Sequence, residues 1–253
     1  MHLSFQQTTL ITLLLVSARI LAWLLVAPPV ATAGVPKTVR VALSVALSLT
    51  MLKSQTPHAP TAELAPVLSA LMQQIVIGAG LGFLTRLLFT AIEAAGGLLD
   101  LFGGFSLSAA YEPLTTTTTS IFGKFYGLLA TTLIFATNAH LVIFQGLLRT
   151  FRAIPIDGRV NLTRLDQQVA GAASSLFVAA LQIAGPVLVV LFVADIALGV
   201  LNRIAPQLNA FSMSFPVKIS LTLLLVGGSL TLMPQVVVRI AGHANDVIAA
   251  VTG

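Results

Sequence analysis

The sequence has no cysteine and very few charged residues. The absence of cysteine excludes disulfides, thiolate metal sites and cysteine nucleophiles. Charged residues make up 8% of the chain and apolar residues 57%, whereas soluble proteins have roughly 25% charged residues. A soluble domain needs more polar side chains than this to cover its surface. The composition therefore predicts an integral membrane protein.

Residues that carry catalytic or metal chemistry are also scarce. The chain has four histidines, and no two of them have the spacing of a metal site on one helix face. Ser106 lacks the trailing glycine of a nucleophile elbow, and the glycines from Gly78 to Gly82 lack the lysine of a phosphate-binding loop. The thirteen Lys and Arg are scattered singly, whereas a nucleic-acid surface needs them clustered. We therefore predict no catalytic, metal or cofactor site and no nucleic-acid partner.

Long apolar segments follow one another along the whole chain. They lie near residues 10–33, 39–52, 64–92, 121–148, 169–200 and 217–240. Because a spanning helix needs about 20 mostly apolar residues, the second segment could instead be a buried or re-entrant helix. The third, fourth and fifth are longer than a bilayer requires, so they must tilt, bend or leave it. We expect one all-α membrane domain over residues 1–253, with about six long helical segments and breaks between them.

The ends and loops say little about orientation. No Lys or Arg precedes Arg19, so the first segment lacks the basic start of a signal peptide and is expected to be retained.

If the six segments crossed the membrane one after another, equal numbers of Lys and Arg would lie on its two sides. The positive-inside rule normally gives a bias. Either a segment is miscounted, or the chain does not cross the bilayer as a simple serpentine.

Charged side chains interrupt the apolar segments. They are Arg19, Arg86, Glu93 and Asp195. Each costs about 2.5–3.5 kcal/mol at membrane depth unless it is paired or hydrated. Arg86 and Glu93 fall on one helical face, and Asp195 and Arg203 flank the end of the fifth segment. Such charges form either a proton relay or structural pairs completed by a neighbouring subunit. A relay normally needs several carboxylates in register, and Asp195 is alone in the fifth segment, so structural pairs are favoured.

Two glycines in the third segment indicate close helix packing. Gly78 and Gly82 are spaced so that another helix backbone can approach them within a membrane. The sequence leaves open whether that helix belongs to this chain or to another subunit.

Residues 96–120 read GGLLDLFGGFSLSAAYEPLTTTTTS. The glycines, Pro113 and the run of threonines argue against a continuous helix. The stretch is nevertheless rich in apolar side chains, and unpaired backbone groups in lipid each cost several kcal/mol. We expect it to lie inside protein or along a wet cavity, with an ordinary buried connection as the alternative.

Residues 201–216 read LNRIAPQLNAFSMSFP, between two apolar segments. Pro206 is expected to break the fifth helix. Asn202, Gln207 and Asn209 can then bond the freed backbone groups, while Phe211 and Phe215 pack apolar faces. The pattern predicts a broken-helix corner that is buried against protein.

The order of these stretches matches one known family. The corner has the sequence NRIAPQLNAF followed by Phe215 and Pro216, and it comes after an N-terminal region with Arg19, a glycine-rich third segment, the loop to Pro113 and an Asn-Ala-His motif at 138–140. Together they resemble the FliR family of flagellar biosynthetic proteins over nearly the whole chain. Glu112 replaces the usual Asp and Ala139 the usual Gly, and Asp100 lies in an altered approach to the loop. The injectisome homologue shares the corner, whereas Asn138 and His140 favour the flagellar branch.

The resemblance implies a non-enzymatic subunit of the type III export gate in the bacterial inner membrane, at the flagellar basal body. Its partners would be FliP, FliQ and FlhB-type subunits, unfolded export substrates and the membrane. The family's loop plugs the pore, which here corresponds to Gly103, Gly104, Phe105, Ser106, Leu107, Ala110, Tyr111, Glu112 and Pro113. The broken-helix corner corresponds to Asn202, Arg203, Pro206, Gln207, Asn209, Phe211, Phe215 and Pro216.

Two other functions remain open at this point. One is an injectisome export gate subunit. The other is a small secondary transporter with its binding site at the broken helices. Such transporters are usually built from inverted halves, which the sequence does not show.

Overall fold

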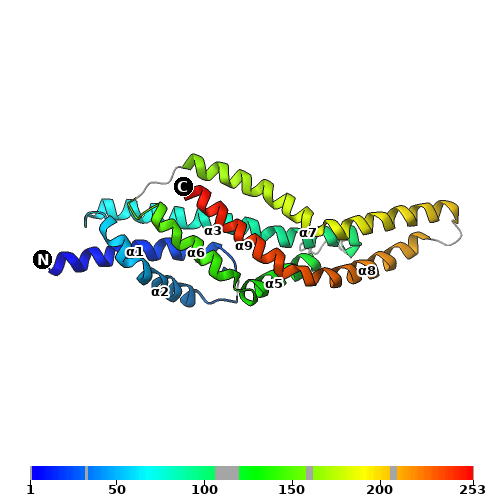
Figure 1. Ribbon diagram of the computed structural model, residues 1–253, viewed down its shortest axis with the longest axis horizontal. Helices are drawn as coiled ribbons and strands as arrows, with labels where there is room; N and C mark the ends of the chain where they lie inside the picture. The colour runs from blue at the N-terminus through cyan, green and yellow to red at the C-terminus, as the bar shows by residue number, and fades with distance from the viewer. Residues whose placement is uncertain (1, 32–33, 106–119, 158–161, 206–209, 253) are drawn as a thin grey trace, which may run out of the picture. The chain divides into compact units, whose positions relative to one another are not determined.

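A computed structural model describes residues 2–31, 34–105, 120–157, 162–205 and 210–252. The described part is helical and contains no strand (Figure 1). Its elements are α1 (His2–Val26), α2 (Lys37–Gln55), η1 (Thr56–His58), α3 (Leu64–Gly103), α5 (Ile121–Ala136), α6 (Ala139–Ala153), α7 (Leu162–Ile204), α8 (Ala210–Ser229), η4 (Leu230–Leu232) and α9 (Met233–Thr252).

Several of these helices are long and apolar enough to cross a membrane. Four such stretches occur in the described residues: Gln7–Val26, Leu64–Gly103, Val169–Ile204 and Met213–Val251. The pair α5 and α6, interrupted at Thr137 and Asn138, gives a fifth if it counts as one span. The prediction of an all-α membrane protein is confirmed. Of the six predicted apolar segments, only the short second one does not qualify as a candidate membrane span in the described residues.

Two predicted boundaries are wrong. Residues 96–103 belong to α3, although their glycines argue against a helix. The fourth and fifth apolar segments were expected near 121–148 and 169–200, but α6 extends to Ala153 and α7 begins at Leu162. At Gly96 close packing against α5 outweighs local propensity, which is a weak determinant by itself.

The described residues group into two compact units. The first comprises Met1–Leu88, Asn138–Ala173 and Arg239–Gly253, and the second Phe89–Thr137 and Ser174–Val238. Helices α3, α7 and α9 each contribute to both units. That residues 1–253 act as a single domain stays a prediction.

In the first unit, α1 packs beside α2, and α2 beside α6 (Figure 1). Helix α3 meets α1 at its two spaced glycines: a Cβ added at Gly78 would lie 2.2 Å from the carbonyl oxygen of Arg19, and one at Gly82 would lie 3.1 Å from that of Trp23. Any side chain at Gly78 would therefore collide with the α1 backbone. Of the two alternatives for this glycine pair, the structure shows packing within the chain.

Helix α2 has its polar side inward. Its buried residues are Arg40, Ser44, Ser48 and Gln55. The hydroxyls of Ser44 and Ser48 donate to the carbonyl oxygens of Val41 and Val45 in the same helix. The side chains of Val39, Val45 and Leu49 are exposed, so the middle of the outward face of this helix is apolar. A surface of this kind suits lipid or another protein rather than water.

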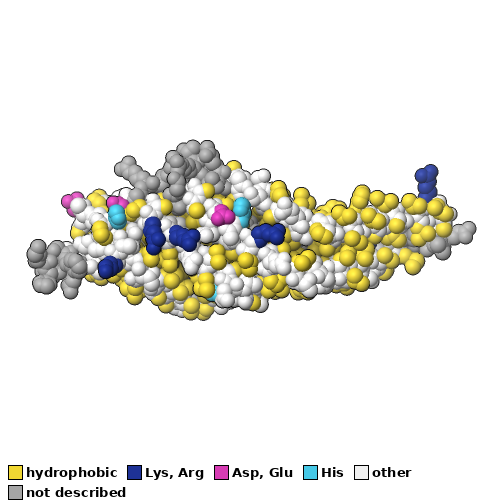
Figure 2. Space-filling model, in the orientation of Figure 1, with side chains coloured by type: hydrophobic (Ala, Val, Ile, Leu, Met, Phe, Trp, Pro, Cys, Tyr) yellow, Lys and Arg dark blue, Asp and Glu magenta, His cyan; other side chains and the backbone are white. Residues whose placement is uncertain are grey.

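In the second unit, the end of α3 packs against α5 at a glycine. A Cβ added at Gly96 would lie 2.3 Å from the carbonyl oxygen of Phe122 and 2.7 Å from the amide nitrogen of Gly123. Helices α7 and α8 lie side by side (Figure 1). Hydrophobic side chains cover much of their visible face (Figure 2). In the apolar window of α7 only 22% of the residues are buried, so most of this helix has no cover within the described chain.

Candidate functional site

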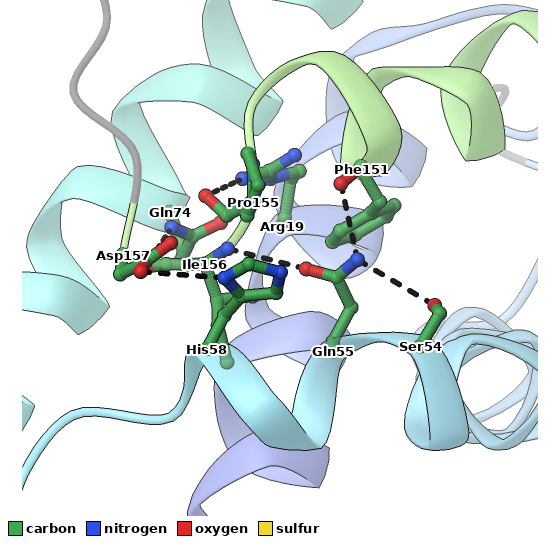
Figure 3. A network of polar contacts seen from close by, with 9 residues as sticks. All are labelled: Arg19, Ser54, Gln55, His58, Gln74, Phe151, Pro155, Ile156 and Asp157. Atoms are coloured by element: carbon green, nitrogen blue, oxygen red, sulfur yellow. Dashed lines mark hydrogen bonds and ion pairs between the residues drawn. The ribbon is translucent and has the colours of Figure 1, made fainter.

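Arg19 occupies the centre of a buried polar network in the first unit (Figure 3). Its side chain has no exposed surface. Its Nε donates to Oε1 of Gln74 at 2.6 Å, and its two terminal nitrogens lie 3.4 Å from Thr150 Oγ1 and 3.5 Å from the carbonyl oxygen of Pro155. The guanidinium carbon lies 4.2 Å from the centre of the Phe151 ring. Among the described residues Arg19 has no ion pair, so an amide, a hydroxyl, a carbonyl and an aromatic ring compensate its charge.

Two glutamines extend this network to the connection after α6. Gln74 Nε2 donates to the carbonyl oxygen of Ile156 at 3.1 Å. Gln55 Nε2 donates to the carbonyl oxygen of Phe151 at 3.0 Å, and Gln55 Oε1 accepts from the amide of Ile156 at 3.2 Å. Helices α1, α2 and α3 thus bind one short stretch of backbone through side chains. The sequence analysis identified Arg19 but missed both glutamines. A polar amide side chain within or next to an apolar segment could have indicated that each glutamine is buried and hydrogen-bonded.

Asp100 of α3 binds the start of α5, in the second unit. Its side chain is buried, and its carboxylate accepts from the Ser120 hydroxyl and from the amide of Phe122 at 3.0 Å. Ser120 in turn caps α5 by accepting from the amide of Gly123 at 2.9 Å. A carboxylate at a helix N-terminus is favoured by the helix dipole. These bonds, here called the Asp100 clamp, hold together the two sides of the predicted plug loop.

Only the start of the predicted plug lies in the described residues. Gly103 ends α3, where an added Cβ would lie 2.7 Å from Thr222 Oγ1. Gly104 has a φ of +87°, which favours glycine, and the Phe105 ring meets the Phe122 ring edge-on at 5.0 Å between centroids. The other predicted plug residues lie outside the described residues: Ser106, Leu107, Ala110, Tyr111, Glu112 and Pro113.

The broken-helix corner is described only in part. Helix α7 ends at Ile204, directly before the proline that was expected to break it, and Asn202 and Arg203 are exposed in its last turn. Phe215 and Pro216 belong to α8, as does Phe211, whose side chain is not described. Pro206, Gln207 and Asn209 lie outside the described residues. The described corner residues of α7 are not covered by this chain, so their burial against another protein stays a prediction.

The remaining charges of the apolar segments are exposed. Arg86 and Glu93 both lie on exposed positions of α3. Asp195 pairs with Lys218 of α8, whose Nζ lies 2.8 Å from Oδ1 and 2.9 Å from Oδ2. The sequence had set Asp195 beside Arg203, because an interhelical partner cannot be seen from spacing along one helix. No group of three or more His, Asp or Glu that could hold a metal occurs in the part of the chain that the structure describes.

Polar networks of this kind hold helices together in an apolar chain. The family model of bacterial export proteins, family 1, matches residues 10–244. The chain belongs to this family.

Several relatives in this export family have flagellar names. The flagellar biosynthetic protein FliR of Pectobacterium carotovorum subsp. carotovorum is 29% identical over 236 residues, which cover 91% of this chain and 88% of that protein. FliR of Escherichia coli (strain K12) is 30% identical over 223 residues, covering 86% and 82%. The surface presentation of antigens protein SpaR of Shigella sonnei is 28% identical over 159 residues, covering 62% and 60%. The resemblance to FliR is confirmed.

Proposed function

We propose that this chain is a non-enzymatic subunit of the flagellar type III protein export gate, in the bacterial inner membrane at the flagellar basal body. The observation that supports this best is membership of the export family over residues 10–244, with FliR proteins matching most of the chain. The apolar helices suit a membrane location. The described polar networks join helix to helix, which is a structural role.

The proposed partners are FliP, FliQ and FlhB-type subunits, with unfolded flagellar proteins as the exported substrates. Support comes from the apolar surface that the described chain leaves uncovered on α2, α7 and α8. Helices of other subunits can cover it in the assembled gate, and lipid covers the rest.

We further propose that residues 103–113 plug the channel. Apolar side chains in a narrow pore disfavour hydrated ions and can close it by dewetting. Glycines at its start permit backbone conformations that other residues rarely adopt, as Gly104 does. The Asp100 clamp and the Phe105–Phe122 contact support this proposal, because they hold the end of α3 against the start of α5 on the two sides of the loop that would contain the plug.

Deleting residues 104–110 tests the plug. The expected result is a larger ion leak across the membrane, measured in cells or vesicles that hold the assembled gate. Replacement of Gly34 by Ser is the control, since no atom lies within 4 Å of a Cβ at that glycine, and it should leave the leak unchanged. If the deletion variant assembles fully and leaks no more than the control, the chain does not plug the pore in this way.

Export by a non-flagellar machine is the second candidate, because SpaR also matches this chain. Restoring motility to a flagellated host that lacks its own FliR separates the two: a flagellar subunit restores swimming, and a subunit of another export machine does not. A secondary transporter would instead take up a small solute when the purified chain is reconstituted alone, which the export gate would not do.

A further inference from the structure

Arg19 lies inside the first candidate span, Gln7–Val26, and its side chain has no exposed surface. Its hydrogen-bond partners come much later in the chain. Gln74 is 55 residues away, Thr150 is 131 and Pro155 is 136. A charged side chain at membrane depth is costly unless it is paired or hydrated. The first span therefore carries a cost that only later parts of the chain remove.

Helix α3 supplies the first part of this compensation. Gly78 lets α3 approach the backbone of α1 at Arg19, where an added Cβ would lie 2.2 Å from the carbonyl oxygen. Gln74 lies one turn before Gly78 on α3, and its Oε1 accepts from Arg19 Nε at 2.6 Å. The pairing of α1 with α3 thus satisfies one of the three guanidinium nitrogens.

The second part comes from residues 150–157, here called the docking strap (Figure 3). The terminal nitrogens of Arg19 lie 3.4 Å from Thr150 Oγ1 and 3.5 Å from the carbonyl oxygen of Pro155. The guanidinium carbon lies 4.2 Å from the centre of the Phe151 ring, and an aromatic face attracts a cation most strongly away from water. Two guanidinium nitrogens and the ring contact therefore depend on the position of the strap.

Gln55 of α2 holds the docking strap in place. Its Nε2 donates to the carbonyl oxygen of Phe151 at 3.0 Å, and its Oε1 accepts from the amide of Ile156 at 3.2 Å. Its third described hydrogen bond is to Ser54, so none of the three involves Arg19. Loss of Gln55 would loosen the strap, and with it the compensation of the charge, while Arg19 itself stays unchanged.

We propose that Arg19 is a concealed degradation signal, which the docking strap covers only in a chain that is complete and correctly packed. When the strap is not docked, the guanidinium lies uncompensated in an apolar helix, and a membrane protease removes the chain. An uncompensated charge weakens the hold of the first span on the bilayer, and cells continuously remove proteins that are incompletely folded. A docked strap spares the chain because it restores the missing contacts.

Removal of the charge should have opposite effects with and without a docked strap. In the full-length chain, Arg19→Met should shorten the half-life about twofold, because Gln74 and Thr150 lose their donor. Gln55→Ala should shorten it about tenfold, and adding Arg19→Met to that variant should lengthen it several-fold. Pulse-chase labelling of all four chains, in cells that express the other gate subunits, measures this. If Arg19→Met shortens the half-life in both backgrounds, or changes it in neither, the proposal is overturned.

Arg19→Lys shows whether the signal is the charge. In the Gln55→Ala chain, Arg19→Lys keeps a positive charge and should stay short-lived, whereas Arg19→Met should recover. Equal recovery with lysine and methionine would contradict a signal based on charge. Gln145→Ala is the matched control for Gln55→Ala, since Gln145 is exposed on α6, and it should keep the wild-type half-life.

A host depleted of its membrane proteases separates removal of the chain from a failure to insert it. There the Gln55→Ala chain should accumulate in the membrane fraction to the wild-type level, as judged by immunoblot. If it is as scarce as in the normal host, proteolysis is not the cause, and Arg19 is not a degradation signal.

Discussion

Arg19 shows how a charge can be kept in the interior of an apolar chain. Burial of an isolated cation is costly, and a buried ion pair recovers that cost only with good geometry and further hydrogen bonds. Here the described contacts are an amide, a hydroxyl, a carbonyl and an aromatic ring. The planar guanidinium can donate in several directions and stack on the ring at once, which a lysine ammonium cannot do. Arg19 thereby binds α1 to α3 and to the end of α6.

Replacement of Arg19 by Met tests this role. The variant leaves Gln74 and Thr150 buried without their donor, so we expect the free energy of unfolding to fall by about 2–3 kcal/mol, as for lost hydrogen bonds to charged groups. Denaturation of the purified chain in detergent would measure it. Arg152→Met is the control: Arg152 is exposed at the end of α6, and its loss should change stability by about 0.5 kcal/mol or less. Equal effects of the two substitutions would mean that Arg19 contributes no more than a surface charge.

At the scale of single helices, the contact of α3 with α5 depends on one of two adjacent glycines. A Cβ at Gly96 would meet the backbone of Phe122 and Gly123, whereas the atom nearest to a Cβ at Gly97 is Ser120 Oγ at 3.8 Å. The backbone at Phe122 is also held by the Asp100 clamp, so it cannot move aside without breaking those bonds. The same substitution should therefore have opposite effects at neighbouring positions.

The prediction is that Gly96→Ala lowers and Gly97→Ala raises thermal stability. Overpacking at Gly96 should cost about 1–3 kcal/mol, while alanine at Gly97 should gain up to about 1 kcal/mol from its higher helix propensity. Thermal unfolding followed by circular dichroism would show one midpoint below the wild type and one above it. Two variants that both gain stability would show that α3 and α5 do not cross closely at Gly96.

The element scale also shows what the sequence could and could not predict. Apolar runs located the helices, since a membrane helix is recognised by length and composition. They misplaced the end of α3, because glycine propensity at 96–103 was read without the backbone of α5 that Gly96 accommodates. The partner of Asp195 was missed for a related reason: Lys218 is distant along the chain and comes close only when α7 and α8 pair. Asp100 was noted only as a departure from the family, because its partners at Ser120 and Phe122 lie beyond the loop.

For the molecule as a whole, apolar residues fill the core and also cover much of the surface, unlike in a soluble protein. Helix α2 buries serines, an arginine and a glutamine and exposes valines and a leucine. The windows Val169–Ile204 and Met213–Val251 are each 22% buried. Much of the apolar surface therefore depends on lipid or on other subunits, and the carboxylate of Asp195 lies within such a surface. We therefore expect the chain to be stable only as part of an assembly.

Expression with and without the proposed partners tests this dependence. Alone, the chain exposes the Asp195 carboxylate on an apolar helix face, which lipid covers poorly, so membrane proteases should remove it. With FliP and FliQ present it should persist. We expect a several-fold longer half-life in the second case, because small changes in stability alter cellular abundance by such factors. Pulse-chase labelling in a strain that lacks the flagellar genes would measure it. Co-expression of an unrelated membrane protein controls for general loading of the membrane. A half-life that is the same alone and with partners would mean that the chain covers its own surfaces, and that neither the exposed face of α2 nor that of α7 is a subunit contact.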